Sequence, residues 1–128
     1  AGTHSVIVYD VDGDGHDEML VGTYMLNHDG EIRWMLPFAP TFSGGGDNHI
    51  DLADVGPVGK DGRVVVAFPN NCVVADAGTG DILWKHTSGH GQWAYIRKVR
   101  PNLPGNQIIF AEKLETRRLF DADGVELD

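Results

Sequence analysis

An acidic loop near the start of the chain has the residue types and the spacing of a site for a hard cation. Carboxylates stand at loop positions 1, 3, 5 and 9, at Asp10, Asp12, Asp14 and Glu18. Gly15 holds position 6, where a sharp turn is needed, and the backbone carbonyl of His16 is available at position 7. Ca²⁺ takes six to eight oxygen ligands, which alternate residues of a tight loop can supply. Because five carboxylates within nine residues repel one another, we predict one bound Ca²⁺ here rather than a solvated acidic turn.

Three histidines precede corresponding segments of the chain and could support acid–base chemistry. His4, His49 and His90 stand 7, 6 and 9 residues before valines that recur along the sequence. An imidazole can act as a general base or acid, recognise a uronate, or ligate a softer metal such as Zn²⁺. Alternatively, each histidine considered alone could simply cap the end of a strand through hydrogen bonds. We predict that His49 and His90 are catalytic.

Polar and basic residues near these histidines complete the candidate site. Asn48 and Gln92 neighbour the two histidines, and with His4 and Lys98 they form the predicted substrate-binding set. Arg97 and Lys98 belong to a tight basic cluster that would suit a ligand carrying a carboxylate. On a strand, Arg97 and Lys98 project to opposite faces, so they cannot both contact one ligand from the same side. Ion pairing with acidic residues of a neighbouring unit explains the basic residues equally well.

A repeat of about 44 residues organises the elements that must position these residues. Val11, Val55 and Val99 recur at intervals of 44. Each unit contains four short β-type runs with no convincing helical period. The predicted strands are 5–9, 19–23, 24–27 and 31–36, then 49–53, 63–68, 72–76 and 81–86, then 93–99, 107–112, 116–121 and 125–127.

Four strands in each repeat of this length predict an all-β fold made of three consecutive β-propeller blades. The predicted units are 1–44, which carries the calcium loop, 45–88 and 89–128. Because closed propellers need at least about four blades, the three units would be part of a ring of about seven or eight blades. The competing all-β prediction is a β-sandwich whose strands are evenly spaced by chance.

The loops of the second and third units that correspond to the calcium loop have lost nearly all their carboxylates. They are 54–62 and 98–106, and they are rich in Pro and Gly. We expect turn chemistry to hold them without metal. The sequence therefore predicts one Ca²⁺ in this chain rather than three.

Composition narrows the class of protein. The 128 residues carry 19 Asp and Glu against 10 Lys and Arg, a formal charge of −9, which disfavours nucleic acid as a partner. No apolar segment is long enough to span a membrane. The lone cysteine, Cys72, lies in an apolar run and is predicted to be a buried structural thiol.

The motifs resemble two groups of known repeats. The Asp-Val-Asp-Gly-Asp-Gly loop at 10–15 is similar to the calcium loops of FG-GAP propeller repeats. The element Asp76-Ala-Gly-Thr-Gly-Asp-Ile-Leu-Trp84 resembles the hairpins of quinoprotein-like propellers, in which the Trp docks one repeat on the next. Together with the sister-loop sequence Arg100-Pro-Asn-Leu-Pro-Gly105, they look like the propeller polysaccharide lyases of the rhamnogalacturonan lyase type.

This resemblance implies a calcium-stabilised, secreted, bacterial-type protein that acts on acidic polysaccharide. Such lyases cleave uronate-containing glycans by β-elimination, in which a base removes the proton next to the carboxylate and a cation neutralises the enolate. His49 or His90 would be the base and Arg97 the cation. Two other functions stay open. One is a non-catalytic module that binds carbohydrate or protein, and the other, more distant, is a quinoprotein dehydrogenase.

Overall fold

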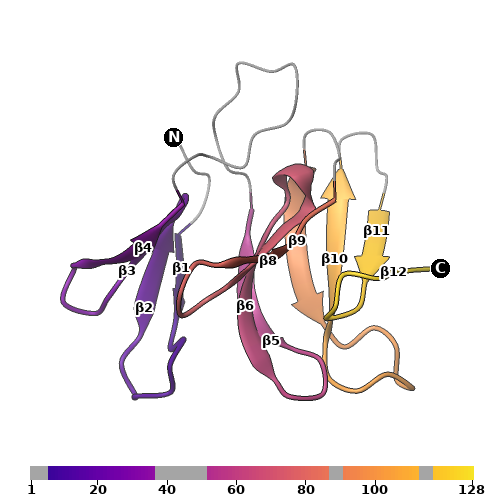
Figure 1. Cartoon of the computed structure of the whole chain (residues 1–128), viewed down its shortest axis with the longest axis horizontal. Coiled ribbons are helices and arrows are strands. Elements are labelled where there is room, and N and C mark those ends of the chain that lie inside the picture. Colours follow the sequence, from indigo (N-terminus) through magenta and orange to yellow (C-terminus); the bar gives the residue numbers. More distant parts are fainter. Residues whose placement is uncertain (1–5, 37–51, 87–90, 113–116) are drawn as a thin grey trace.

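The structure is a computed structural model that describes residues 6–36, 52–86, 91–112 and 117–128. Strands and tight turns make up this part of the chain, with one short 3₁₀ turn, η1, at Asn70–Cys72. The strands form three separate antiparallel sheets of four, each in simple up-and-down order along the chain (Figure 1). The first sheet contains β1 (Val6–Tyr9), β2 (Glu18–Val21), β3 (Tyr24–Leu26) and β4 (Ile32–Met35). The second contains β5 (Asp54–Val58), β6 (Arg63–Phe68), β7 (Val73–Asp76) and β8 (Ile82–Trp84). The third contains β9 (Gly91–Arg97), β10 (Gln107–Glu112), β11 (Arg117–Phe120) and β12 (Glu126–Leu127).

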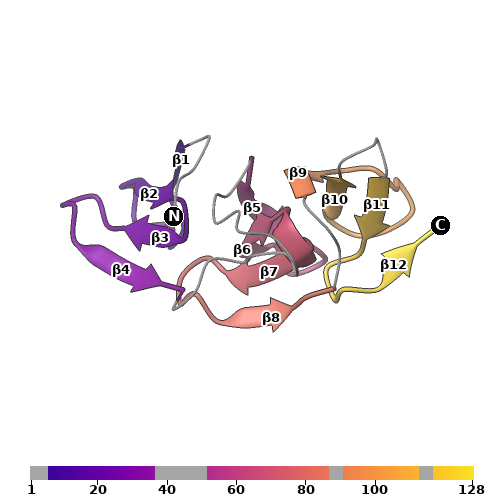
Figure 2. The ribbon, with the colours of Figure 1, turned by 90° about the horizontal axis from the view of Figure 1, so that it is seen from above.

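The predicted assembly of propeller blades is wrong, although the prediction of an all-β chain is correct. The three sheets are separate units that pack as successive layers, in a sandwich-like arrangement (Figure 2). A repeat of four strands determines how each sheet forms, because hairpin turns fix local strand pairing. The same repeat does not determine how neighbouring sheets are arranged around a common axis, so the 44-residue period could not establish a ring.

The middle sheet is buried on both faces, which explains the continuous apolar run Val64–Phe68 in β6. On one face, Val66 and Phe68 pack against Leu20 and Met25 of the first sheet. On the other face, Val65, Ala67 and Val74 pack with residues of the third sheet. These third-sheet residues are Ala94, Ile96, Ile108, Phe110 and Phe120. Alternating side chains of one strand therefore join two separate cores.

Strand β5 lies further along the chain than its predicted position. The sequence predicted a strand at 49–53 and a loop at 54–62, whereas residues 54–58 pair with β6 and the turn is confined to 59–62. The Gly56-Pro57 pair favoured a loop in the sequence. However, β5 is an edge strand of its sheet. Proline is tolerated there because an edge strand does not need every backbone N–H for pairing with a neighbour.

A repeated tryptophan contact joins the sheets. The indole Nε1 of Trp34 in β4 donates to the carbonyl of Ala77 at 2.8 Å, and Trp84 in β8 donates to Ala122 at 3.1 Å. Each ring lies against a glycine of the next hairpin, Gly80 or Gly124. The resemblance of the 76–84 hairpin to quinoprotein-like repeats implied this docking role for Trp84, and an aromatic ring with one polar atom suits a half-buried interface.

Two smaller expectations concern Cys72 and membrane insertion. Cys72 is fully buried in the second core, which confirms the prediction that this thiol is buried. In the described ranges, no helix has the length and apolar character required to cross a bilayer.

Candidate metal site

The acidic loop connects β1 to β2 in the first sheet. Tyr9 pairs with Glu18, so the segment 10–17 is closed at its base by the strand ladder. Two glycines make the tight path possible, with φ of +75° at Gly13 and +89° at Gly15. Side chains other than glycine rarely adopt this left-handed conformation. The predicted sharp turn at Gly15 is therefore present.

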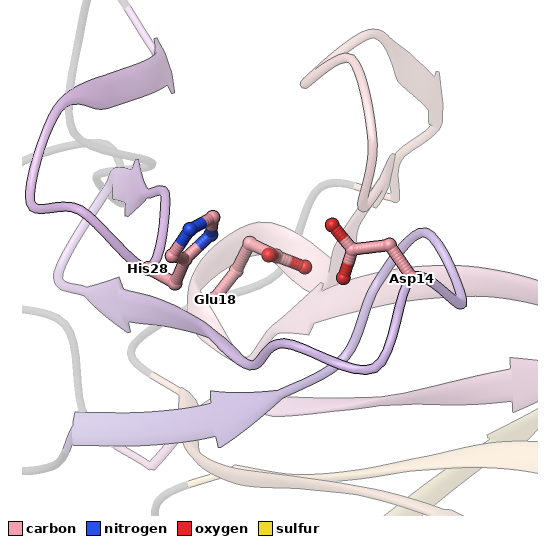
Figure 3. Close-up of side chains that lie close together, drawn as sticks. All are labelled: Asp14, Glu18 and His28. Atoms are coloured by element: carbon pink, nitrogen blue, oxygen red, sulfur yellow. The ribbon is translucent and has the colours of Figure 1, made fainter.

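Carboxylate oxygens converge inside this loop. One group, Asp10, Asp12 and Glu18, has potential ligand atoms that all lie within 4.8 Å of one another. A second group under the same limit contains Asp14, Glu18 and His28, whose side chains point toward one another in Figure 3. Glu18 belongs to both groups. Each of the four side-chain ligands predicted from the spacing therefore belongs to one of two groups that share Glu18.

Backbone amides of the loop hold two of these carboxylates in place. Asp10 accepts N–H groups from Gly13 at 2.8 Å, Asp14 at 3.2 Å and Gly15 at 2.9 Å. Asp14 in turn accepts the N–H of His16 at 2.8 Å. Such side-chain-to-backbone bonds fix both the loop and the direction of the carboxylates. They also supply part of the positive potential that clustered carboxylates need.

Glu18 is the buried member of the cluster, with only 2% of its surface exposed. Its Oε1 accepts the N–H of Val11 at 2.9 Å. One neutral hydrogen bond offsets only part of the cost of burying a carboxylate charge. A cation bound within the loop would offset the rest.

His28 is a member of the cluster that sequence reasoning missed. Residue type and spacing indicated no role for His28, yet the register Met19↔Leu26 places the turn after β3 beside the start of β2, where Glu18 lies. The His28 ring also stacks on that of His16, with centroids 4.4 Å apart and an interplanar angle of 20°. A hairpin prediction that paired β2 with β3 in this register could have placed His28 near Glu18.

Arg33 connects the acidic loop to the second sheet. Its Nη1 donates to Asp12 Oδ2 at 3.1 Å and to Asn27 Oδ1 at 3.3 Å. Its Nε donates to the Gly78 carbonyl, in the hairpin turn of the second sheet, at 2.9 Å. The guanidinium therefore provides one fixed positive charge at the outer edge of the carboxylate cluster.

The corresponding loops of the other sheets replace these carboxylates in different ways. In the third sheet Gln107 stands at the start of β10, as Glu18 does in β2, and its Oε1 accepts the N–H groups of Val99 at 2.9 Å and Arg100 at 2.8 Å. The neutral amide keeps the hydrogen bond and removes the charge. In the second sheet the turn 59–62 is too short to enclose an ion. Neither loop contributes to a metal-ligating cluster within the described residues.

Four of the predicted catalytic and substrate-binding residues lie outside the described residues: His4, Asn48, His49 and His90. Gln92 lies near the start of β9 and Lys98 follows its last residue, so six residues of extended chain put them roughly 20 Å apart. The structure therefore does not bring Gln92 and Lys98 to one ligand. Lys98 Nζ donates to the Leu103 carbonyl.

Arg97 is held by its own neighbours. Its Nη1 lies 3.1 Å from Asp54 Oδ2 and 2.7 Å from the Ile96 carbonyl, and its guanidinium carbon is 5.0 Å from the Tyr95 ring centroid. Asp54 belongs to the second sheet, so this is the inter-unit ion pair that the sequence left open as the alternative.

Two carboxyl groups outside the loop have perturbed pKa values. Burial opposes ionisation of Asp76, but hydrogen bonds from the Arg63 side chain and from the Thr79 and Gly78 amides outweigh burial and lower its pKa. The pKa of Glu126 is also lowered, chiefly by the hydrogen bond from Arg118. Both groups belong to structural ion pairs and lie far in sequence from the acidic loop.

Comparison with known proteins places this architecture in a family. The family described as "Rhamnogalacturonan lyase family 11, C-terminal domain" matches residues 1–128. Among curated proteins, the chain is 38% identical over 91 residues to rhamnogalacturonan exolyase YesX of Bacillus subtilis, covering 65% of this chain and 13% of the relative. It is 29% identical over 133 residues to rhamnogalacturonan endolyase YesW of the same organism, covering 98% and 20%. The chain thus spans a fifth or less of these relatives.

Solved structures agree with the sequence matches. The crystal structure of rhamnogalacturonan lyase YesW superposes with a TM-score of 0.74 at 25% identity, over 99% of this chain and 21% of the solved one. The Bacillus licheniformis rhamnogalacturonan lyase PL11 gives a TM-score of 0.75 at 25% identity, over 99% and 21%. The lyase part of the resemblance seen in the sequence is confirmed. The FG-GAP and quinoprotein-like part finds no support in these matches.

Proposed function

The chain belongs to the family of rhamnogalacturonan lyase family 11 C-terminal domains, and we propose that it is a calcium-stabilised part of an extracellular polysaccharide lyase. The observation that carries the proposal is the convergence of Asp10, Asp12, Asp14 and Glu18 in a chain whose whole length matches a lyase domain family. The relatives named as rhamnogalacturonan lyases support the substrate class.

The residues of the loop fit a hard cation better than a soft one. Asp10, Asp12, Asp14 and Glu18 would hold Ca²⁺ through side-chain oxygens, and the His16 carbonyl would add a backbone oxygen. Among the described residues, His28 is the one nitrogen ligand grouped with Glu18, and a soft metal would prefer more than one such ligand. The ion would supply positive charge that neutralises the clustered carboxylates. Its effect is structural, because the loop links two strands of one sheet.

The proposed reaction of the parent lyase is β-elimination of a uronate-containing glycan. A base takes the proton next to the uronate carboxylate, and the C–O bond to the glycosidic oxygen at the β-carbon breaks. The departing oxygen keeps the electron pair and takes up a proton, and the new double bond remains on the uronate product. His49 and His90 are our candidate bases. Arg97 remains a candidate for neutralising the enolate, with Asp54 holding the guanidinium in place at 3.1 Å. Separate His49→Ala and His90→Ala variants should lose formation of the unsaturated uronate at unchanged melting temperature.

The second candidate function is a non-catalytic carbohydrate-binding domain. It is favoured by the pairing of Arg97 with Asp54, which gives the only described candidate catalytic residue a structural role. The two histidine variants separate the functions. If both variants leave the lyase activity of the parent protein unchanged, the binding function of this domain is favoured. If that activity is lost while the fold is retained, a catalytic role of this domain is favoured.

A further inference from the structure

A cleft of about 520 Å³ opens between the second and third sheets, away from the acidic loop. One wall is the turn 59–62, with Lys60 and Asp61, together with Arg63 at the start of β6. The opposite wall is the hairpin turn between β11 and β12, which contributes Asp121, Ala122 and Asp123. Its volume falls in the range of roughly 300–1,000 Å³ that is typical of small-molecule sites.

Comparison with the interface between the first and second sheets explains why this cleft is open. Trp34 and Trp84 make the same contact with the next hairpin, so Arg33 and Leu83, the residues just before them, occupy equivalent positions. Arg33 extends across the first interface to the Gly78 carbonyl. Leu83 is too short to do so, and it lines the cleft instead. The turn 59–62 is also much shorter than the loop 10–17, which leaves further space.

The lining combines an apolar floor with hydrogen-bonding walls. Val58, Val65, Leu83 and Trp84 form apolar surface, and the last of these adds an aromatic ring. Such surfaces suit the C–H faces of a sugar ring, while the polar walls can donate to and accept from its hydroxyls.

Several wall residues are already fixed in position. Arg63 Nε donates to Asp76 at 3.0 Å, and the guanidinium keeps other N–H groups that a ligand can use. Asp121 Oδ1 accepts the N–H groups of Asp123 and Val125, both at 2.9 Å. Asn106 Nδ2 donates to the Pro57 carbonyl at 3.0 Å. A preorganised site loses less conformational entropy when a ligand binds.

The charges of the walls distinguish between kinds of sugar. Lys60 and Arg63 are cationic, whereas Asp61, Asp121 and Asp123 are acidic, so the lining carries one more negative than positive charge. A uronate would bring its own carboxylate next to these three. A neutral sugar satisfies the same donors and acceptors without repulsion.

The geometry points to a binding site for a neutral saccharide in the cleft between the turn 59–63 and the hairpin 121–123. This inference rests on the proposed function, because the polysaccharide named for the relatives contains both a neutral sugar and a uronate. The inference assigns the cleft as the site where the chain binds the neutral sugar of that polysaccharide.

Titration of the ¹⁵N-labelled chain with methyl α-L-rhamnopyranoside, followed by amide chemical shifts, tests the inference. We expect saturable shifts at 60–63 and 121–123, and weaker or no shifts with D-galacturonate. Leu83→Arg places a guanidinium where Arg33 fills the first interface, and it should weaken binding by at least about tenfold. Ile82→Arg is the matched control, since Ile82 is exposed and does not line the cleft, and it should bind like the parent chain.

Three results would overturn the inference: no saturable shift, equal or tighter binding of D-galacturonate, or unchanged binding by a folded Leu83→Arg variant. If that variant does not fold, Asp123→Ala on the exposed turn replaces it. We expect Asp123→Ala to weaken saccharide binding by the same factor, and unchanged binding by this variant would overturn the inference. Addition of Ca²⁺ in separate samples reports on amides 10–18. If saccharide shifts no amide at the cleft while Ca²⁺ shifts the amides 10–18, only the saccharide site is rejected. If Ca²⁺ does not shift the amides 10–18, the calcium part of the proposed function is rejected.

Discussion

The buried carboxylate of Glu18 accepts a hydrogen bond from the N–H of Val11 at 2.9 Å. In the third sheet Gln107 makes the same bond to Val99, also at 2.9 Å. One position therefore serves two purposes in related loops. The hydrogen bond shapes the loop in both, and only the carboxylate adds a charge that can bind a metal ion.

Glu18→Gln should keep the fold and lose Ca²⁺ affinity. The amide oxygen can still accept from Val11, as Gln107 shows, while the buried negative charge is gone. We expect the dissociation constant measured by isothermal titration calorimetry to rise by at least about tenfold. Glu31→Gln, an exposed change in the same sheet, is the control and should bind normally. Unchanged affinity in Glu18→Gln would show that Glu18 is not a ligand.

Trp34→Ala should strongly destabilise the contact between the first and second sheets. The substitution removes a buried indole and its hydrogen bond to Ala77, and large-to-small changes of this kind cost about 3–5 kcal/mol. The free energy of unfolding in urea measures the effect. Val6→Ala, on an exposed face of β1, should cost much less. Equal losses would mean that the tryptophan does not join the sheets.

Gly80→Ala should destabilise the chain more than Gly62→Ala. Both glycines have positive φ, +80° and +65°, so both substitutions carry a backbone penalty of about 1 kcal/mol. A Cβ at Gly80 would lie 2.7 Å from the Trp34 ring, whereas one at Gly62 would meet nothing within 4 Å. The difference between the two unfolding free energies isolates the tryptophan contact. A difference near zero would contradict the close approach.

The Arg63–Asp76 pair should stabilise the fold in a pH-dependent way. Because the pKa of Asp76 is lowered below its ordinary value of 3.8, its ionised form is favoured by folding. This contribution is fully present above that value and is lost as the pH falls through the lower pKa of the folded state. Asp76→Asn removes this titration, so its unfolding free energy should fall less steeply below pH of about 4. Parallel pH profiles would contradict the assignment.

The sequence predicted most strands and the acidic loop because both depend on local chemistry. Continuous runs of apolar, mostly β-branched residues such as Val64–Phe68 form buried strands wherever hairpin turns pair them. Carboxylates at alternate positions around Gly15 converge because the loop is short. Both signals are contained within a few residues of chain.

The features that the sequence did not predict depend on contacts between residues far apart in the chain. The arrangement of the sheets depends on contacts such as Trp34 with Ala77, which a repeat length does not specify. The approach of His28 to Glu18 depends on the register of β2 with β3. The position of β5 depended on an edge location that makes Pro57 acceptable in a strand.

We propose that the acidic loop binds Ca²⁺ and thereby stabilises this member of the lyase domain family. The most direct test compares the melting temperature of the chain with excess Ca²⁺ and with chelator, alongside Asp12→Asn and the matched loop variant Asp17→Asn. Binding to the folded state alone stabilises it by about 2.7 kcal/mol when free ligand is about 100-fold above the dissociation constant. We predict that the parent chain and Asp17→Asn melt at a higher temperature with Ca²⁺, and that Asp12→Asn melts at one temperature in both conditions. A parent chain whose melting temperature is the same with Ca²⁺ and with chelator would contradict the claim.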